Sequence, residues 1–238
     1  MLKVELHTHT ADDPVDRIPH TSEALIDRAA VLGYRALAIT LHDHQLDLRG
    51  LEPYARDRGI VLISGVERTI EGRHVLLLNF DSGTDEVRSF EDLAHLKHQR
   101  RGLVVAPHPY FPGAHSLGRD LDRHADLFDA VEVNAMFTRL VDFNRPAERW
   151  AAAHGKPIVG NCDVHRLRQL GSTFSIVDAA PDADDICEAV ARGRVRVDAR
   201  PLAWHAAASI AADVLIAGAL PQWEPRAARA RSGFDPAF

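Results

Sequence analysis

Cysteine is scarce in this chain of 238 residues, which contains only two. Two cysteines cannot form a disulfide framework, and they cannot build a zinc site from cysteine alone. Basic residues are also in deficit, because 28 lysines and arginines face 34 aspartates and glutamates, a net charge of −6. This charge argues against an extended nucleic-acid interface and against an anionic membrane surface. We therefore expect no nucleic-acid duplex and no membrane among the partners, and the sequence leaves the oligomeric state open.

Long hydrophobic runs are nearly absent as well. The N-terminal residues lack the apolar core of about seven or more residues that a signal peptide needs, which predicts a cytoplasmic location. Residues 202–220 are apolar for long enough to span a membrane. However, Asp213 would cost about 2.5–3.5 kcal/mol near the centre of a bilayer. We interpret this segment as a helix packed on the core of the protein.

Apolar, strand-like segments alternate with amphipathic, helix-like segments along most of the chain. The strand candidates are residues 3–6, 36–40, 60–66, 74–80, 103–106, 130–134, 157–160 and 194–198. The helix candidates are residues 22–32, 51–58, 86–99, 142–154 and 184–191. This alternation predicts a mostly parallel sheet with helices outside it, and the number of units favours a β/α barrel over an open doubly wound sheet.

A single domain is expected over residues 1–221, including a C-terminal helix, because barrels of about 200–250 residues commonly form one domain. Residues 222–238, which contain two prolines after Gln222 and several arginines, are predicted to form a peripheral tail that is open to disorder.

Histidine is abundant, with 14 copies, and several of these lie just after predicted strands. In a parallel barrel all strands end at one face, which carries the catalytic loops. Residues two apart on an extended segment point to the same side, so an HxH or DxH pair can reach one ion. The side chains expected to converge are His7, His9, His42, Glu67, His108, Asp163 and His165. They predict a metal site that holds more than one ion.

His74 differs from this set, because it precedes its strand. A hairpin over residues 69–72 would return it to the face that carries Glu67. The histidines expected to lie away from this face, without a function, are His44, His95, His98, His115, His124, His154 and His205.

Five segments of the chain resemble, in order, the motifs of the PHP family, the polymerase and histidinol phosphatase domain. They are residues 6–10 (LHTHT), 38–42 (AITLH), 65–67 (GVE), 107–109 (PHP) and 161–165 (NCDVH). The resemblance covers roughly residues 1–200. It implies a distorted seven-stranded β/α barrel of TIM-like form, with the metal site at the carboxyl ends of the strands. It also implies two or three ions of zinc, manganese or iron and hydrolysis of phosphoesters.

The resemblance assigns the ligands to three ions. The first ion would be held by His7, His9, Glu67 and Asp163. Glu67 would bridge to a second ion, which His74 and His108 complete, while His42 and His165 would belong to a third. The loop after the first motif should supply one more ligand. Its distance from the helix start favours Asp16, residue type favours His20, and Asp13 is also a candidate.

Two positions depart from the pattern of the family. Leu41 stands where an aspartate often precedes the histidine, so an acceptor that could orient a ligand is missing. Cys162 stands where a serine is common, and we interpret it as a small buried residue.

The expected function is hydrolysis of a phosphoester on a small phosphorylated metabolite or nucleotide. Two ions that share Glu67 would lower the pKa of a bound water and provide a hydroxide nucleophile, with Glu67 and Asp163 as the catalytic carboxylates. Arg166 and Arg168 are candidates for binding the phosphate, and Arg68 is a further one. The alternatives are a barrel hydrolase of C–N or carboxylic ester bonds, and a metal-binding regulatory module without catalysis.

Overall fold

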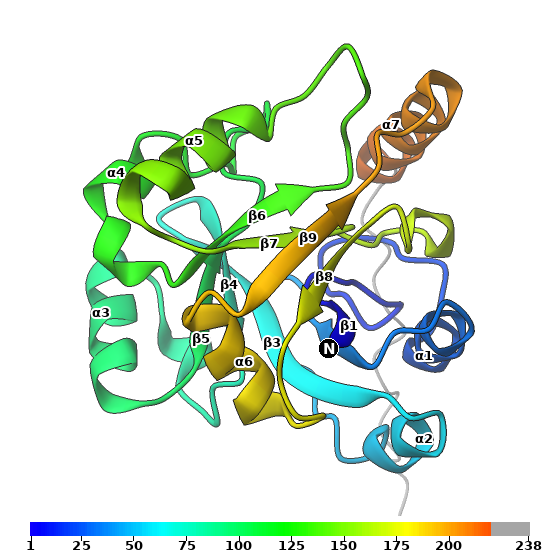
Figure 1. Ribbon diagram of the computed structural model, residues 1–238, viewed down its shortest axis with the longest axis horizontal. Helices are drawn as coiled ribbons and strands as arrows, with labels where there is room; N and C mark the ends of the chain where they lie inside the picture. The colour runs from blue at the N-terminus through cyan, green and yellow to red at the C-terminus, as the bar shows by residue number, and fades with distance from the viewer. Residues whose placement is uncertain (220–238) are drawn as a thin grey trace, which may run out of the picture.

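A single sheet of nine strands forms the centre of the computed structural model, which describes residues 1–219 (Figure 1). The strands are β1 (Leu2–Glu5), β2 (Ala36–Ile39), β3 (Val61–Ile70), β4 (Arg73–Leu78), β5 (Leu103–Ala106), β6 (Ala130–Asn134), β7 (Ile158–Asn161), β8 (Thr173–Val177) and β9 (Val195–Ala199). Their order in the sheet is β7-β6-β5-β4-β3-β2-β1-β8-β9. The tail predicted for residues 222–238 lies outside the described residues.

Seven of these strands run in one direction, and only β4 and β8 run against them. The pairs β1–β2, β2–β3, β5–β6 and β6–β7 are parallel, whereas β4 and β8 each pair antiparallel with both neighbours. The sheet therefore has two strands more than the seven expected. β8 was missed because its sequence, TFSIV, is half polar and follows β7 without a long helix between them.

The two ends of the sheet approach each other and nearly close it into a barrel. The amide of Gly160 on β7 donates a hydrogen bond to Ser175 Oγ on β8 over 2.8 Å, and this hydroxyl donates to the Gly160 carbonyl over 3.2 Å. A Cβ atom at Gly160 would lie only 2.6 Å from Val197 Cγ1 on β9. The predicted fold class, a distorted β/α barrel, is confirmed.

The main helices are α1 (Ser22–Val31), α2 (Glu52–Asp57), α3 (Phe90–Gln99), α4 (Asp120–Arg123), α5 (Arg145–His154), α6 (Ala183–Ala191) and α7 (Trp204–Ala219). Single 3-10 turns form at Thr84–Glu86, Ala125–Leu127 and Leu167–Gln169. Most helices surround the outside of the sheet (Figure 1). α3 begins four residues later than expected, because Ser89 and Asp92 form a capping box there. No helix in residues 1–219 is long and apolar enough to cross a membrane.

The core has three parts, and one of them fills the barrel itself. Side chains of α3, β4 and β5 share one part of the core with those of α5 and β6, and side chains of α1 and α2 pack on β2. Inside the barrel, Ile186, Cys187 and Val190 of α6 pack against apolar residues of the strands. Asn79, which follows β4, donates to Asp184 of α6, so α6 covers the end of the barrel opposite to the start of β4. The start of β4, which carries His74, lies at the end of the barrel that α6 does not cover. A site can form at that end.

The predicted hairpin after Glu67 is present. β3 and β4 pair in register, with Glu67 opposite Leu76 and Thr69 opposite His74. The turn between them uses left-handed backbone at Glu71 (φ 49°) and Gly72 (φ 79°). The chain therefore reverses within two residues and returns His74 to the end of the barrel that Glu67 faces.

Candidate metal centre

The predicted ligands meet at one end of the barrel. His7 and His9 follow β1, His42 follows β2, and His108 follows β5. Glu67 lies within β3, which extends three residues past it before the hairpin. Asp163 and His165 follow β7, and isolated bridges join Thr8 to Val164 and His42 to Glu67. These bridges continue the parallel sheet beyond the strands and hold the four segments side by side.

The carboxylate of Glu67 lies among five imidazoles and is almost fully buried. Its Oε2 atom is 3.3 Å from Nε2 of His7 and of His9, and 3.2 Å from Nε2 of His42. Its Oε1 atom is 2.8 Å from Nδ1 of His74 and 3.3 Å from Nε2 of His108. Each oxygen thus faces a different set of nitrogens, which is the arrangement that a bridging carboxylate requires. We call these six residues the Glu67 group.

Asp163 faces two of the same imidazoles as Glu67. Its Oδ1 atom is 3.4 Å from Nε2 of both His7 and His9, and 3.3 Å from Nδ1 of His165. Asp163 has a φ angle of 50° and His108 one of 26°. Left-handed backbone at residues other than glycine costs about 1–3 kcal/mol each and concentrates at functional sites.

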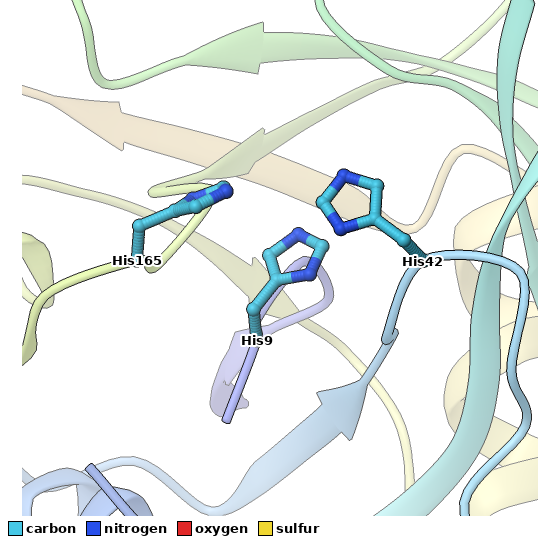
Figure 2. A group of neighbouring side chains, drawn as sticks. All are labelled: His9, His42 and His165. Carbon is cyan, nitrogen blue, oxygen red and sulfur yellow. The ribbon is translucent and has the colours of Figure 1, made fainter. Parts of the chain in front are cut away.

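A second cluster, which we call the outer group, consists of His9, His42 and His165 with Asp16. Figure 2 shows the three imidazoles pointing into a common space from three different segments of the chain. Their ring centroids are 4.4 Å apart for His9 and His42 and 4.5 Å apart for His9 and His165. Oδ2 of Asp16 lies 3.0 Å from Nε2 of His165.

The sequence left open which of Asp13, Asp16 and His20 is a ligand, and the structure gives these three residues different contacts. Asp16 belongs to the outer group. Asp13 contacts the Nδ1 atoms of His9 and His42 instead, at 2.9 Å and 3.0 Å. His20 is buried, and its ring belongs to none of the groups of metal-binding side chains found among residues 1–219. Burial lowers the pKa of His20 to about 4, so its imidazole is neutral.

The donor atoms of the centre fit a cation. Nε2 of His7, Nε2 of His9 and Oδ1 of Asp163 are buried and have no hydrogen-bond partner among the described residues. Buried polar atoms without partners are costly, and these three face one another within 3.4 Å. Among residues 1–219, four sets of three side chains have donor atoms within 4.8 Å of one another. Imidazoles with carboxylates suit divalent zinc, manganese or iron better than calcium or magnesium.

Electrostatics in the centre keep its carboxylates ionised. Burial alone would raise the pKa of Glu67, but the imidazoles of His7, His74 and His42 hold it well below its usual value. Burial likewise would lower the pKa of His7, but Asp163 and Glu67 raise it well above the usual range. The raised pKa of His7 favours its protonated ring when no cation is present, so cation binding to its Nε2 atom would release a proton.

Two buried carboxylates orient the predicted ligands by hydrogen bonds, a role that the sequence indicated for neither of them. Asp13 is one. The other, Glu132 on β6, accepts from Nδ1 of His7 over 2.8 Å through Oε2, and from the amide of His108 over 3.3 Å through Oε1. Its position between Val131 and Val133, in the middle of an apolar strand, is the signal that could have identified it.

His115 also lies at the site, contrary to expectation. Its ring stacks on that of His74, with centroids 4.5 Å apart and planes 12° apart. The amide of His74 donates to the His115 carbonyl over 2.9 Å, so the loop after β5 folds back over the start of β4. The sequence could not indicate this contact, because 40 positions separate the two residues.

A cavity of about 640 Å³ opens beside the centre. One side is formed by the predicted ligands, and the other by Phe111, Met136, Phe143 and Ile210. The rings of Phe111 and Phe143 are 5.6 Å apart and inclined at 59°. The cavity therefore has a polar wall with the metal-binding groups and an apolar wall that includes one residue of α7.

The predicted phosphate-binding arginines do not line this cavity. Arg166 Nη1 donates to the carbonyl of His165 over 2.9 Å, and Arg168 Nη2 donates to Ser209 Oγ on α7 over 3.0 Å. Arg68 is buried, and its guanidinium donates to the carbonyls of Val87, Asp43 and Asp85. Arg68 therefore fastens the hairpin to neighbouring loops, and its prediction as a phosphate clamp is wrong. Cys162 is fully buried, as expected.

The fold of this chain is similar to that of a protein with a PHP-like domain. A family model described as PHP-associated matches residues 142–195, which include Asp163 and His165. A two-domain protein from Bacteroides vulgatus that contains a predicted PHP-like metal-dependent phosphoesterase is similar in structure, with a TM-score of 0.66 and 18% identity over 84% of this chain and 65% of that chain. The resemblance to the PHP family is confirmed.

The match to curated relatives covers a small part of this chain and of their own length. The chain is 43% identical over 68 residues to the PolC-type DNA polymerase III of Streptococcus pyogenes. That match covers 29% of this chain and 5% of the polymerase.

One expectation about partners is corrected by a further structural neighbour. Endonuclease Q, in complex with a 27-mer duplex substrate, has a TM-score of 0.51 and 16% identity over 79% of this chain and 56% of that chain. A fold of this kind can thus be part of a protein that binds duplex DNA. The exclusion of a duplex was wrong because it rested on net charge, whereas charge near the site and added domains decide such binding.

Proposed function

We propose that this protein is a metal-dependent phosphoesterase. The observation that carries the proposal is the Glu67 carboxylate, whose two oxygens face two different sets of imidazoles within 3.3 Å. The proposed ligands are those of the Glu67 group and the outer group, together with Asp163. Two or three ions of zinc, manganese or iron, when bound here, would supply Lewis acidity and an activated water.

Within this proposal, the residues of the chain position the reaction. Glu67 and Asp163 are held as carboxylates by the surrounding imidazoles, so they contribute negative charge at a fixed place. Glu132 and Asp13 hold the rings of His7, His9 and His42 by their Nδ1 atoms. The Nε2 atoms of these rings are thereby directed to the centre.

The cavity supports a substrate with one phosphate and an apolar organic part. No lysine or arginine side chain lines it within residues 1–219, so the phosphate charge would be neutralised at the metal centre. The opposite wall of Phe111, Met136, Phe143 and Ile210 offers apolar surface to the rest of the substrate. A phosphorylated metabolite or a nucleotide fits this description. The cytoplasmic location and the single domain over residues 1–221 remain predictions from the sequence.

The test begins with metal analysis of freshly purified protein. The protein is then assayed with zinc, manganese and iron against phosphomonoesters, nucleotides, phosphodiesters, single-stranded and duplex oligonucleotides, amides and carboxylic esters. We expect bound transition metal and release of phosphate or cleavage of a phosphodiester. Glu67→Gln should abolish turnover, whereas Glu71→Gln, a matched change at the exposed turn of the same hairpin, should not.

Two outcomes would contradict the proposal. Turnover of amides or esters without phosphoester cleavage would favour the alternative hydrolase. Metal-loaded protein that cleaves none of the panel would favour a metal-binding regulatory module.

A further inference from the structure

Asp13 contacts the Nδ1 atoms of two predicted ligands, His9 and His42, whereas Glu67 faces the Nε2 atoms of the same two rings. Its side chain is fully buried in the loop after β1. Oδ2 faces Nδ1 of His9 at 2.9 Å, Nδ1 of His42 at 3.0 Å and the amide of His42 at 3.0 Å. Oδ1 accepts from the amides of Val15 and Asp16 over 2.9 Å and 2.8 Å. All five hydrogen-bond partners of this carboxylate among the described residues are donors.

An ionised carboxylate can only accept hydrogen bonds, so the imidazole nitrogens that face it must carry their protons. This fixes His9 and His42 with Nδ1 protonated, which leaves Nε2 of each ring free to bind a metal. Both Nε2 atoms do face the centre, at 3.3 Å and 3.2 Å from Glu67 Oε2. The two rings lie nearly parallel, with 22° between their planes.

The same carboxylate also places Asp16. The Asp16 amide donates to Asp13 Oδ1, and the Asp16 side chain reaches Nε2 of His165. Three of the four members of the outer group therefore depend on Asp13: His9 and His42 through their rings, and Asp16 through its backbone. By contrast, His74 and His108 contact Glu67 directly and have no hydrogen bond to Asp13 among those described.

We propose that Asp13 is a positioning residue that assembles the outer metal position and sets the tautomers of His9 and His42 without binding metal itself. It supplies the acceptor that Leu41, next to His42, cannot provide. The inference rests on the proposed metal centre. It identifies Asp13 as the residue that organises the position formed by the outer group.

An asparagine at position 13 cannot replace the aspartate. An amide has one acceptor oxygen and one NH2 group. If the oxygen accepts from the two histidines, the NH2 group must face the amides of Val15 and Asp16, which are donors as well. Asp13→Asn therefore breaks one of the two sets of contacts while it keeps the size of the side chain.

The test compares Asp13→Asn with Asp12→Asn. Asp12 is the neighbouring residue and undergoes the same charge change, but its carboxylate contacts only the hydroxyls of Thr10 and Ser22 among the described hydrogen bonds. Zinc bound per chain is measured by elemental analysis after dialysis at fixed free zinc, and affinity by competition with a chromophoric chelator. We expect Asp13→Asn to lose one equivalent, with affinity at that position about 10–100-fold weaker. Asp12→Asn should match the wild type.

A second measurement needs no variant and applies even if Asp13→Asn does not fold. In zinc-loaded wild-type protein, 15N NMR of the imidazoles should show protonated Nδ1 and metal-bound Nε2 for His9 and His42. The reverse tautomer at either ring, or equal zinc stoichiometry and affinity in the two variants, would overturn the inference. Wild-type protein that binds no zinc, manganese or iron would instead contradict the proposed function.

Discussion

At the scale of single residues, Glu132 shows how a buried carboxylate inside a strand can orient the predicted ligands at the end of the barrel. It is fully buried on β6 and accepts hydrogen bonds from His7, from the amide of His108, and from the side-chain amides of Asn134 and Asn161. Burial alone would raise the pKa of Glu132, but the imidazole of His7 lowers it below the usual value. A buried carboxylate with four donors fixes the orientation of each of them.

We therefore expect Glu132→Gln to weaken metal binding by about 10–100-fold, because one acceptor oxygen becomes a donor that opposes these donors. The measurement is zinc affinity by chelator competition. Glu148→Gln, on the exposed face of α5, serves as the control and should bind zinc as the wild type does. Unchanged affinity in Glu132→Gln would show that His7 keeps its orientation without this carboxylate.

At the scale of elements, the closure of the barrel depends on a close approach at β7. Gly160 is packed between β8 and β9, where a Cβ atom would meet Val197 Cγ1 at 2.6 Å and the Phe174 carbonyl oxygen at 3.1 Å. The contact with Phe174 is a backbone contact, so a side-chain rotation cannot relieve it. β7 also leads directly into Asp163 and His165, which links this packing to the site.

Gly160→Ala should therefore lower the free energy of unfolding by about 1–3 kcal/mol, as overpacking typically does. Urea unfolding followed by circular dichroism measures the change. Gly50→Ala is the matched control, because a Cβ atom there meets nothing within 4 Å. Equal stability of the two variants would mean that the two ends of the sheet separate easily.

The sequence predicted the ligands at strand ends better than the residues and strands that hold those ligands in place. His7, His9, His42 and Glu67 could be placed because each lies at or near the end of an apolar run that reads as a strand. Glu132 was not predicted: its position in an apolar strand is unusual for a glutamate, but the position alone does not reveal which side of the sheet the side chain faces. β8 was missed for a related reason. Its buried Ser175 is tolerated only because it bonds to the backbone of Gly160, a contact between distant segments.

The loop residues mark a second limit of prediction. Asp13, Asp16 and His20 lie within eight positions and could each have been a ligand by residue type. Their roles are separated by the turn in which Asp13 accepts the amides of Val15 and Asp16, which directs the Asp16 side chain toward His165. Short loops of this kind follow from tertiary contacts, here the rings of His9 and His42, and no pattern along the chain specifies them.

At the scale of the whole molecule, the two ends of the barrel differ: apolar packing that stabilises the fold lies at one end, and the candidate metal centre lies at the other. One end is filled by the apolar face of α6, whereas the other gathers imidazoles and carboxylates. At that end, Nε2 of His7, Nε2 of His9 and Oδ1 of Asp163 have no hydrogen-bond partner among residues 1–219. Buried polar atoms without partners reduce the stability of the folded state. An ion that binds these atoms in the folded state and not in the unfolded chain stabilises the fold by mass action.

Metal removal should consequently lower the melting temperature. A ligand at 100 times its dissociation constant stabilises the folded state by about 2.7 kcal/mol, which for a domain of this size corresponds to roughly 5–10 °C. Calorimetric scans would compare protein treated with a chelator, the same protein after addition of zinc or manganese, and the same protein with calcium, which suits an imidazole-rich site poorly. We expect zinc or manganese, but not calcium, to restore the higher melting temperature, and Glu67→Gln to reduce the difference. Identical melting temperatures in all conditions would mean that this end of the barrel holds no transition metal, since such binding cannot leave the folding equilibrium unchanged.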